Sequence, residues 1–377
     1  MASSTHNQQQ QQRHHHHPNP YGTTAAPPPT PSTQPHPHST SDAGADALSR
    51  LLQRLPPSLS TLPNRRSSPP STTTTSPPLV SLSDPSRTLT ASILSASQLG
   101  YFQLTNHSIS PQLARSAESE SLSLFNLPLD QRETSFPKNW PLGFDGEDTE
   151  DESFCLDSSC STESAELSLT SLLEFTCEME KVGLEVIEAL SCAVGFENPA
   201  RKDPTRVCSL MWISDGSPGN KPVMLGKFYP YVVGLQYQIN CQKKYSMLAD
   251  SGWVSVLPQV DSVLVTLGDI AQVWSNGNLK KVRGRATPVL GDGNSSPHCI
   301  SMSVLLTLPL DSIVSPLLPR GAAGDGEEDG VNEAQDGGAG KKKERRFHSF
   351  PFEDYAWSVY HERLLLKDPL DRYRAPE

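Results

Sequence analysis

The stretch Leu264–Gly277, LVTLGDIAQVWSNG, combines a strand pattern with strong turn signals. Its first residues complete a β-rich run, and Asn276-Gly277 favours a type I′ hairpin turn because both residues tolerate a positive φ. Similar short β-rich runs surround it, each bounded by turn residues: Val207–Ile213, Leu235–Met247, Trp253–Val256, Ser262–Leu267, Leu279–Arg285 and Cys299–Leu308. Many evenly spaced short strands predict a β-barrel or jelly roll.

The residues before these strands alternate between strand and helix patterns. We predict strands at Leu79–Leu82 and Tyr101–Leu104, and helices at Ala91–Leu99 and Pro111–Phe125. Leu169–Val194 has apolar residues at gaps of three and four, which predicts a long amphipathic helix with one buried face. This part of the chain therefore predicts an N-terminal α/β lobe.

Two further segments complete the predicted fold. Gly146–Ser161 is acidic and irregular, and we expect a loop there. Tyr355–Arg374 has the pattern of a closing helix. The predicted fold class is therefore α+β: a double-stranded β-helix (jelly roll) core with an N-terminal helical and α/β lobe and a C-terminal helix.

The composition predicts long segments that bury no core. Of 377 residues 34 are Pro, and only 35% are hydrophobic. We expect two disordered segments, a low-complexity arm at residues 1–77 and an insertion at residues 320–346. The ordered parts are then an N-terminal lobe at 78–200, a jelly-roll domain at 201–319 and a C-terminal helix packed on the core at 347–377.

Charge and cysteine usage restrict the partners and the compartment. A net charge of −11 argues against a nucleic-acid partner. No run approaches the roughly 20 apolar residues that span a bilayer, so no membrane partner is expected. Seven scattered Cys residues without a Cys-x-x-Cys pair fit free thiols in a reducing compartment. We expect a cytoplasmic monomer, with a plastid or nuclear location as the alternatives.

Several short motifs occur in a fixed order along the chain. They are Gly100–His107 (GYFQLTNH), Phe125–Pro128 (FNLP), Asp250–Val256 (DSGWVSV) and Leu264–Gly277. In this order they resemble the motifs GFFQLxNHG, FxLP, DGxWVxV and VVNIGDxxQxWSNG of the plant iron(II)/2-oxoglutarate-dependent dioxygenases, the isopenicillin N synthase-like superfamily. The resemblance extends from about Pro78 to Arg374. It implies a jelly-roll fold that binds iron and 2-oxoglutarate.

The resemblance also implies where the chemistry of this superfamily should lie. The members hold iron with a His-x-Asp pair and a second His, and they bind 2-oxoglutarate with an Arg that is followed by x-Ser. On this chain the His-x-Asp positions are occupied by Tyr229 and Tyr231, and the second His position by Gly284. The Arg position holds Cys299, while Ser301 is retained. This divergent member therefore lacks the metal triad.

These substitutions lead us to expect no catalytic residue, no metal site and no cofactor. Fe(II) and 2-oxoglutarate are expected only if the chemistry of the superfamily survives. We expect Tyr229 and Tyr231 to lie two residues apart on one strand, so that both side chains share one face. If that face is the barrel interior, the two rings fill the former metal cavity. Their hydroxyls would then need partners such as Ser301. The candidate pocket lining is Tyr229, Tyr231, Cys299 and Ser301.

Three functions stay open on the sequence. The first is a non-catalytic member of the superfamily that binds a small apolar molecule or a protein partner. The second is an active dioxygenase, an oxidoreductase that acts on a small plant metabolite through non-standard ligands such as phenolates and Cys299. The third is a protein-interaction scaffold that uses the arms at residues 1–77 and 320–346.

Overall fold

The structure is a computed structural model that describes residues 74–146, 152–162, 167–215, 229–239, 244–289, 300–317, 345–362 and 368–376. All of them belong to one compact unit, Ser67–Glu377. Most of the two segments predicted to be disordered lies outside the described residues: positions 1–73 of the arm and 320–344 of the insertion. The proposed division of the ordered part at residue 200 stays a prediction.

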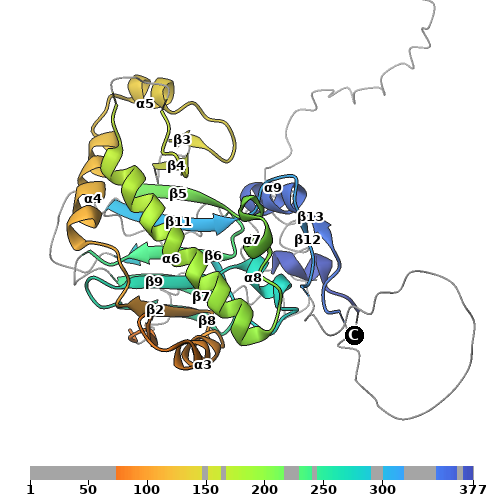
Figure 1. Ribbon diagram of the computed structural model, residues 1–377. Helices are drawn as coiled ribbons and strands as arrows, with labels where there is room; N and C mark the ends of the chain where they lie inside the picture. Colours follow the sequence, from red (N-terminus) through yellow and green to blue (C-terminus); the bar gives the residue numbers. More distant parts are fainter. Residues whose placement is uncertain are drawn as a thin grey trace, which may run out of the picture. The chain divides into compact units, whose positions relative to one another are not determined.

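A large, mainly antiparallel sheet forms the centre of this unit (Figure 1). Its strands in spatial order are β1 (Leu79–Ser81), β2 (Tyr101–Thr105), β9 (Val263–Leu267), β6 (Val233–Tyr237), β11 (Ile300–Thr307), β5 (Cys208–Asp215), β4 (Ser153–Asp157) and β3 (Gly143–Asp145). Only the β1–β2 pair is parallel. Strands from the N-terminal lobe therefore extend the jelly-roll sheet at both of its edges.

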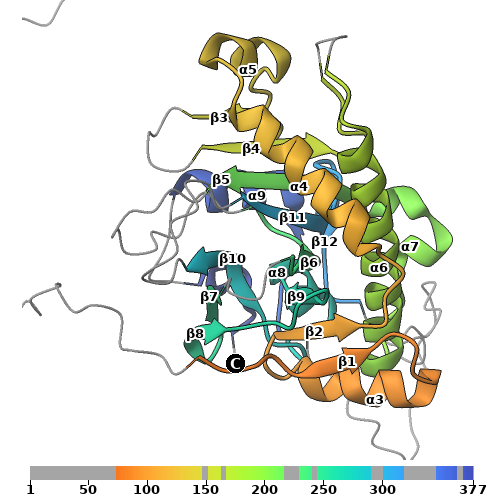
Figure 2. The same ribbon diagram turned by 90° about the vertical axis from the view of Figure 1, so that its left-hand side faces the viewer.

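A second, smaller antiparallel sheet lies opposite the first (Figure 2). Its order is β10 (Val282–Val289), β7 (Lys244–Ala249) and β8 (Gly252–Val256). Tyr245, Met247 and Val256 from this sheet pack with Tyr101 and Leu264 from the large sheet in an apolar cluster. Two antiparallel sheets that share their apolar faces are the arrangement of a jelly roll, so the predicted fold class is confirmed.

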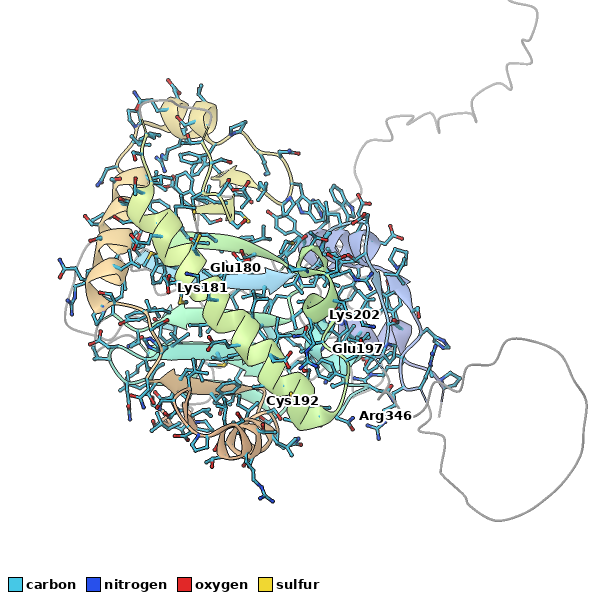
Figure 3. All side chains as sticks on the ribbon, in the orientation of Figure 1. Glu180, Lys181, Cys192, Glu197, Lys202 and Arg346 are labelled. Carbon is cyan, nitrogen blue, oxygen red and sulfur yellow. The ribbon has the colours of Figure 1, made fainter. Side chains whose placement is uncertain are left out.

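Helices cover the outer face of the large sheet (Figure 1). The long helix α6 (Thr170–Val194) lies across it, and Gly183 lets the helix approach closely, because a Cβ there would meet Leu306 Cδ1 at 2.4 Å. Lys181 projects from the exposed face of α6, while the neighbouring Glu180 accepts a hydrogen bond of 2.9 Å from Ser209 Oγ on β5 (Figure 3). The other helices of this region are α3 (Ser86–Ala96), α4 (Pro111–Phe125), α5 (Leu129–Ser135), α7 (Pro199–Lys202) and the 3-10 turn η1 (Pro204–Arg206).

The C-terminal part of the chain packs beside the short helix α8 (Asp269–Trp274), which follows β9. It contains β12 (Ile313–Val314), β13 (Phe350–Pro351), α9 (Phe352–Glu362) and the 3-10 turn η2 (Pro369–Tyr373). The predicted single helix Tyr355–Arg374 is therefore wrong in its extent. The described helix begins at Phe352, and Pro369 opens a separate turn. No helix within the described ranges is long and apolar enough to cross a bilayer.

Two other local predictions are wrong. The segment expected as a loop, Gly146–Ser161, contains strand β4, which pairs with β5 and buries Phe154 and Leu156. Asn276 and Gly277 do have positive φ values of 51° and 79°, but their turn follows helix α8 and joins no hairpin. At β4 the buried apolar residues packed against the large sheet decide the conformation and override the local acidic pattern.

Candidate functional site

The segment that carries both tyrosines lies directly before strand β6 and is held by β11. Thr307 Oγ1 donates a hydrogen bond of 2.7 Å to Pro230 O, and the N–H of Val232 donates one of 2.7 Å to Leu306 O. The prediction that Tyr229 and Tyr231 lie on a strand is wrong, because the ladder of β6 begins at Val233. Pro230 has no N–H to contribute to such a ladder.

The ring of Tyr231 is enclosed by two glycines and is only 2% exposed. A Cβ at Gly268 would lie 2.1 Å from Tyr231 O and 2.7 Å from Tyr231 Cδ2. A Cβ at Gly234 would lie 3.1 Å from Tyr231 Cε2. Real Cβ atoms essentially never come as close as the two distances at Gly268, and the distance at Gly234 is also tight, so the phenol ring fits here because both neighbours lack a side chain.

The hydroxyl of Tyr231 connects the two sheets. It donates a hydrogen bond of 2.6 Å to the backbone carbonyl of Gly284 on β10, and it lies 3.1 Å from Thr266 Oγ1 on β9. Because the single phenolic proton goes to Gly284, the hydroxyl of Thr266 is the donor in the second contact. The Tyr231–Gly284 bond thus joins the two positions where the resemblance implies a carboxylate and an imidazole.

The backbone at Gly284 makes this bond available. Gly284 has φ 72°, in the region that favours glycine, and the pairing of β10 with β7 shifts register between Arg283 and Thr287. A bulge of this kind takes residues out of the ladder and redirects their backbone groups. The carbonyl of Gly284 is therefore free of the ladder and accepts from Tyr231.

Tyr229 lies in a different environment, in which two aromatic rings flank it. Its ring lies 5.9 Å from the ring of Trp140 and 5.9 Å from that of Phe352, which opens α9. It is 3% exposed. Burial raises the pKa of Tyr229 and that of Tyr231 well above the ordinary value of about 10. Both phenols are therefore neutral at physiological pH.

Of the other two predicted pocket residues, the structure describes Ser301 but not Cys299. Ser301 lies on β11, is buried, and accepts a hydrogen bond of 2.5 Å from Gln236 Nε2. The expectation that Ser301 pairs with a tyrosine hydroxyl is wrong for Tyr231, whose partners are Gly284 and Thr266. Cys299 lies outside the described residues, so its place in a pocket stays a prediction.

The residues at these positions do not fit an iron ion. A facial triad needs two imidazoles and a carboxylate. Here the corresponding groups are a phenol kept neutral by burial, a second phenol whose proton is given to Gly284, and a glycine without a side chain. Among the described residues no three His, Cys, Asp or Glu side chains are grouped to hold a metal.

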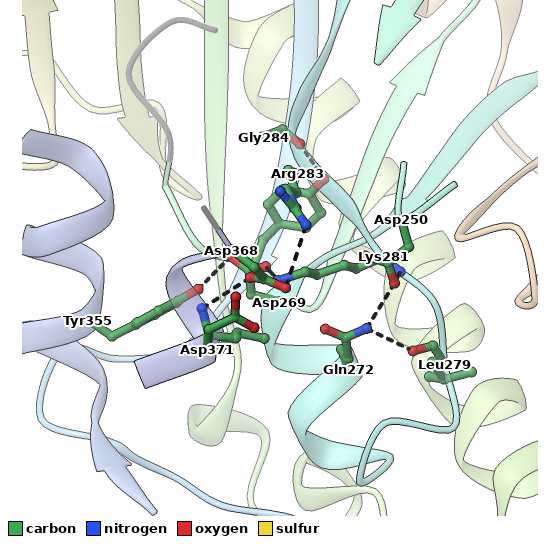
Figure 4. Close-up of polar contacts among 12 residues, drawn as sticks. Asp250, Asp269, Gln272, Leu279, Lys281, Arg283, Gly284, Tyr355, Asp368 and Asp371 are labelled. Atoms are coloured by element: carbon green, nitrogen blue, oxygen red, sulfur yellow. Dashed lines mark hydrogen bonds and ion pairs between the residues drawn. The ribbon is translucent and has the colours of Figure 1, made fainter. Parts of the chain in front are cut away.

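A buried ionic cluster lies next to this site, as Figure 4 shows. Lys281, directly before β10, is fully buried, and its Nζ lies 2.6 Å from Asp269 Oδ1 and 2.6 Å from Asp368 Oδ1. Tyr355 donates a hydrogen bond of 2.8 Å to Asp269 Oδ2, and Arg283 Nη2 lies 3.8 Å from Asp368 Oδ2. The cluster fastens the C-terminal segment and α9 to β10 and α8.

Sequence reasoning missed this cluster and also missed a small pocket that Trp140 lines. The pocket has a volume of about 10 Å³, and Trp140, Trp212 and Tyr360 are among its lining residues. Neither Tyr229, Tyr231 nor Ser301 lines it. Trp140, Trp212 and Tyr360 are far apart in the sequence, so no local pattern predicts that they meet.

Comparison with known proteins agrees with this fold. The sequence model of the 2OG-Fe(II) oxygenase superfamily matches residues 227–304. Gibberellin 2-beta-dioxygenase 2 of Arabidopsis thaliana is 25% identical over 267 residues, which is 64% of this chain and 76% of that protein. Gibberellin 2-beta-dioxygenase 1 of Pisum sativum is 24% identical over 275 residues, covering 64% and 79% respectively.

Solved structures add a likeness in fold. The structure of JOX2 in complex with 2OG, Fe and JA has a TM-score of 0.60 at 17% identity and covers 87% of this chain and 97% of that one. The structure of the rice dioxygenase for auxin oxidation has a TM-score of 0.58 at 17% identity and covers 79% and 99%. The match of the family model and the relatives support the 2-oxoglutarate/Fe(II) dioxygenase superfamily that the motifs predict.

Proposed function

We propose that this chain is a non-catalytic member of its superfamily that acts by binding a small molecule or a protein partner. The observation that carries the proposal is the 2.6 Å hydrogen bond from the Tyr231 hydroxyl to the Gly284 carbonyl. This bond lies between two of the positions from which the superfamily binds iron. It joins the two sheets there without a metal. It also engages the hydroxyl of Tyr231, the residue in the carboxylate position.

The ligand set argues against an active dioxygenase with tyrosine ligands. A phenol binds a metal strongly only as a phenolate, and burial favours the neutral form of Tyr229 and Tyr231. Ionising Tyr231 would also remove the proton that bonds to Gly284. No contact of the described residues favours this second candidate function.

The kind of ligand is inferred from the relatives. Their names refer to gibberellin and to auxin oxidation, and one related structure contains JA. A small organic molecule is therefore the ligand class that we favour over a protein partner. The scaffold hypothesis depends on arms that lie outside the described residues, and the expected monomer stays a prediction.

Metal binding and turnover test this function on the purified full-length protein. Fe(II) is added anaerobically with 2-oxoglutarate, unbound metal is removed, and the iron that remains per chain is measured. Succinate is measured after O2 is admitted. We expect neither stoichiometric iron nor succinate above a protein-free control. One tightly bound iron per chain together with O2-dependent succinate would contradict the proposal.

Two variants sharpen the result. Tyr229→His/Tyr231→Asp/Gly284→His restores the ligand types of the superfamily, and we expect it to retain more iron than the wild-type protein. Tyr229→Phe/Tyr231→Phe removes only the two hydroxyls, and we expect no change in iron content. If the Phe variant instead loses iron that the wild type holds, the phenols are ligands and the non-catalytic assignment is wrong.

A further inference from the structure

A short sequence pattern occurs twice in the described part of the chain, at residues 132–137 (RETSFP) and at residues 346–351 (RFHSFP). Each copy has an Arg three residues before a Ser, and Phe-Pro directly after that Ser. Many serine kinases select an arginine at this distance, because their substrate grooves carry complementary acidic side chains. A Pro two residues after a phosphoserine suits a binding groove, because its fixed φ and missing N–H turn the chain out of the groove. The fold determines which copy is accessible.

The first copy is closed to an enzyme. Ser135 is the last residue of helix α5 and is only 8% exposed. Arg132 makes an ion pair of 2.5 Å with Glu152, and its guanidinium lies 5.0 Å from the ring centroid of Phe144. Both the hydroxyl and the guanidinium of this copy are therefore engaged in the fold.

The second copy is open at its polar side chains. Ser349 lies in extended backbone directly before β13 and is exposed, as are Arg345 and Arg346. Figure 3 shows Arg346 at the surface of the structure. Within the described ranges, the Ser349 hydroxyl makes no hydrogen bond and the two arginines make no ion pair. The hydroxyl and the cations that a kinase reads are thus available together.

The neighbours of Ser349 hold residues 345–351, which we call the Ser349 segment, on the core. Phe347 and Phe350 are buried, and the ring of Phe350 stacks on that of Tyr373 with centroids 4.1 Å apart. The N–H of His348 donates a hydrogen bond of 2.8 Å to Tyr373 O. A groove that encloses a phosphopeptide needs the residues on both sides of the phosphoserine. The Ser349 segment must therefore leave Tyr373 before such a groove can bind it.

We propose that Ser349 is a phosphorylation site, and that the phosphorylated Ser349 segment docks in a phosphoserine-binding domain that holds the phosphate with an arginine cluster. Docking takes place from the released form of the segment, so the contacts with Tyr373 limit it. The inference goes beyond the proposed function and does not depend on it.

The modification supplies the charge that such a domain recognises. The Oγ of Ser349 forms a bond to the γ-phosphorus of ATP, the bond to the ADP oxygen breaks, and the hydroxyl proton passes to the catalytic aspartate of the kinase. The phosphoserine carries about two negative charges and three strong acceptor oxygens. Arginines bind a phosphate through paired hydrogen bonds, and domains of the 14-3-3 class use an arginine cluster for this purpose.

Phosphorylation is tested on the folded full-length protein with Mg²⁺, ATP and a calmodulin-dependent protein kinase, and mass spectrometry locates the modified residues. We expect phosphate at Ser349 and none at Ser135, which has the same pattern in a closed place. Arg346→Gln should slow the modification of Ser349 about tenfold, as loss of a charge-assisted contact does. The unfolded protein is the control, because the kinase should then modify Ser135 as well.

Docking is tested by calorimetry with a purified 14-3-3 domain and the full-length protein that carries phosphoserine at position 349. We expect saturable binding, and none by the unmodified protein or by kinase-treated Ser349→Ala. A free phosphopeptide of residues 345–351 should bind at least about tenfold more tightly, because only the released fraction of the folded chain binds. Tyr373→Ala removes the ring that stacks on Phe350 and should narrow this difference.

Three results would overturn the inference: no phosphate at Ser349 of the folded protein, no binding by the protein that carries it, or binding that persists in Ser349→Ala. Binding of the folded protein as tight as that of the phosphopeptide would contradict the release of the segment. These results are distinct from a failure of the proposed function, since iron retention and succinate formation are measured on the unmodified protein.

Discussion

Two contacts, one on β10 and one directly before it, fasten this strand to the rest of the described structure, one by a neutral hydrogen bond and the other by ion pairs. At Gly284 the link is a single hydrogen bond from a neutral phenol, Tyr231. Three residues earlier, Lys281 makes buried ion pairs with Asp269 and Asp368. The neutral link lies between two positions where the resemblance implies a charged metal centre, and the charged cluster lies beside it. The position of β10 can therefore be kept without iron.

The charged cluster should contribute more to stability than any other contact in this comparison. Lys281→Met leaves Asp269 and Asp368 buried without their shared cation, and loss of one partner of a buried pair costs about 3–5 kcal/mol. The free energy of unfolding from denaturant titration measures this. Lys280→Met, at the exposed neighbouring position, is the control. If both substitutions lower the free energy of unfolding equally, the ion pairs of Lys281 contribute no more to stability than an exposed lysine does.

The two contacts should also respond differently to acid. Burial by itself raises the pKa of Asp368, but the charge of Lys281, its hydrogen bond, the Leu370 N–H and Arg283 together hold that pKa below its ordinary value. Because the folded pKa is the lower one, this stabilisation is present above the unfolded value of about 3.9. It is lost as the pH falls from there through the folded pKa.

Tyr231 has the opposite shift, since burial raises its pKa. Its contribution is fully present below the unfolded pKa of about 10 and is lost only as the pH rises from there through the folded pKa. We therefore expect the destabilisation by Asp368→Asn to shrink between pH 7 and pH 3 while that by Tyr231→Phe stays constant. Unfolding titrations at several pH values check this, and a Tyr231→Phe effect that vanishes in acid would contradict it.

The neutral link should have an intermediate effect on stability. Tyr231→Phe keeps the ring between Gly234 and Gly268 but leaves the Gly284 carbonyl without its donor, which costs about 1–3 kcal/mol. Tyr229→Phe is the matched control, because the described contacts of Tyr229 are with the rings of Trp140 and Phe352. Thermal or denaturant unfolding distinguishes the two. A larger loss of stability from Tyr229→Phe than from Tyr231→Phe would contradict the structural role given to the Tyr231 hydroxyl.

The smallest effect is expected at Ser301, the retained residue of the cosubstrate motif. Its hydroxyl accepts from the buried amide of Gln236, so Ser301→Ala should cost about 1 kcal/mol through one lost hydrogen bond. We expect no change in 2-oxoglutarate affinity, measured by calorimetry, because the non-catalytic assignment gives Ser301 a structural role. Specific 2-oxoglutarate binding that this substitution abolishes would contradict that role.

The sequence predicted the sheets well and the contacts between them poorly. Strand runs such as Ser262–Leu267 were found because their apolar residues and turn signals are local. The bond between Tyr231 and Gly284 was not found, because it depends on a positive φ at Gly284 and on a register shift in β10. Neither feature leaves a periodic pattern in the sequence.

The buried partners of Lys281 were unpredictable for the same reason. Asp368 is separated from Lys281 by 87 residues, and only the tertiary fold brings the two together. Helix α8 was missed because six residues are too few to establish a helical period within a strand-rich region. Strand β4 was missed because acidic neighbours concealed a short buried run.

The central claim is that a phenol-to-carbonyl hydrogen bond occupies the former iron site. A crystal structure of the protein soaked anaerobically with Fe(II) and 2-oxoglutarate, with anomalous data at the iron edge, tests it at the atoms concerned. We predict no anomalous peak at this place and Tyr231 Oη still bonded to Gly284 O. An iron peak about 2 Å from Tyr231 Oη, the length of a metal–oxygen bond, would contradict the account.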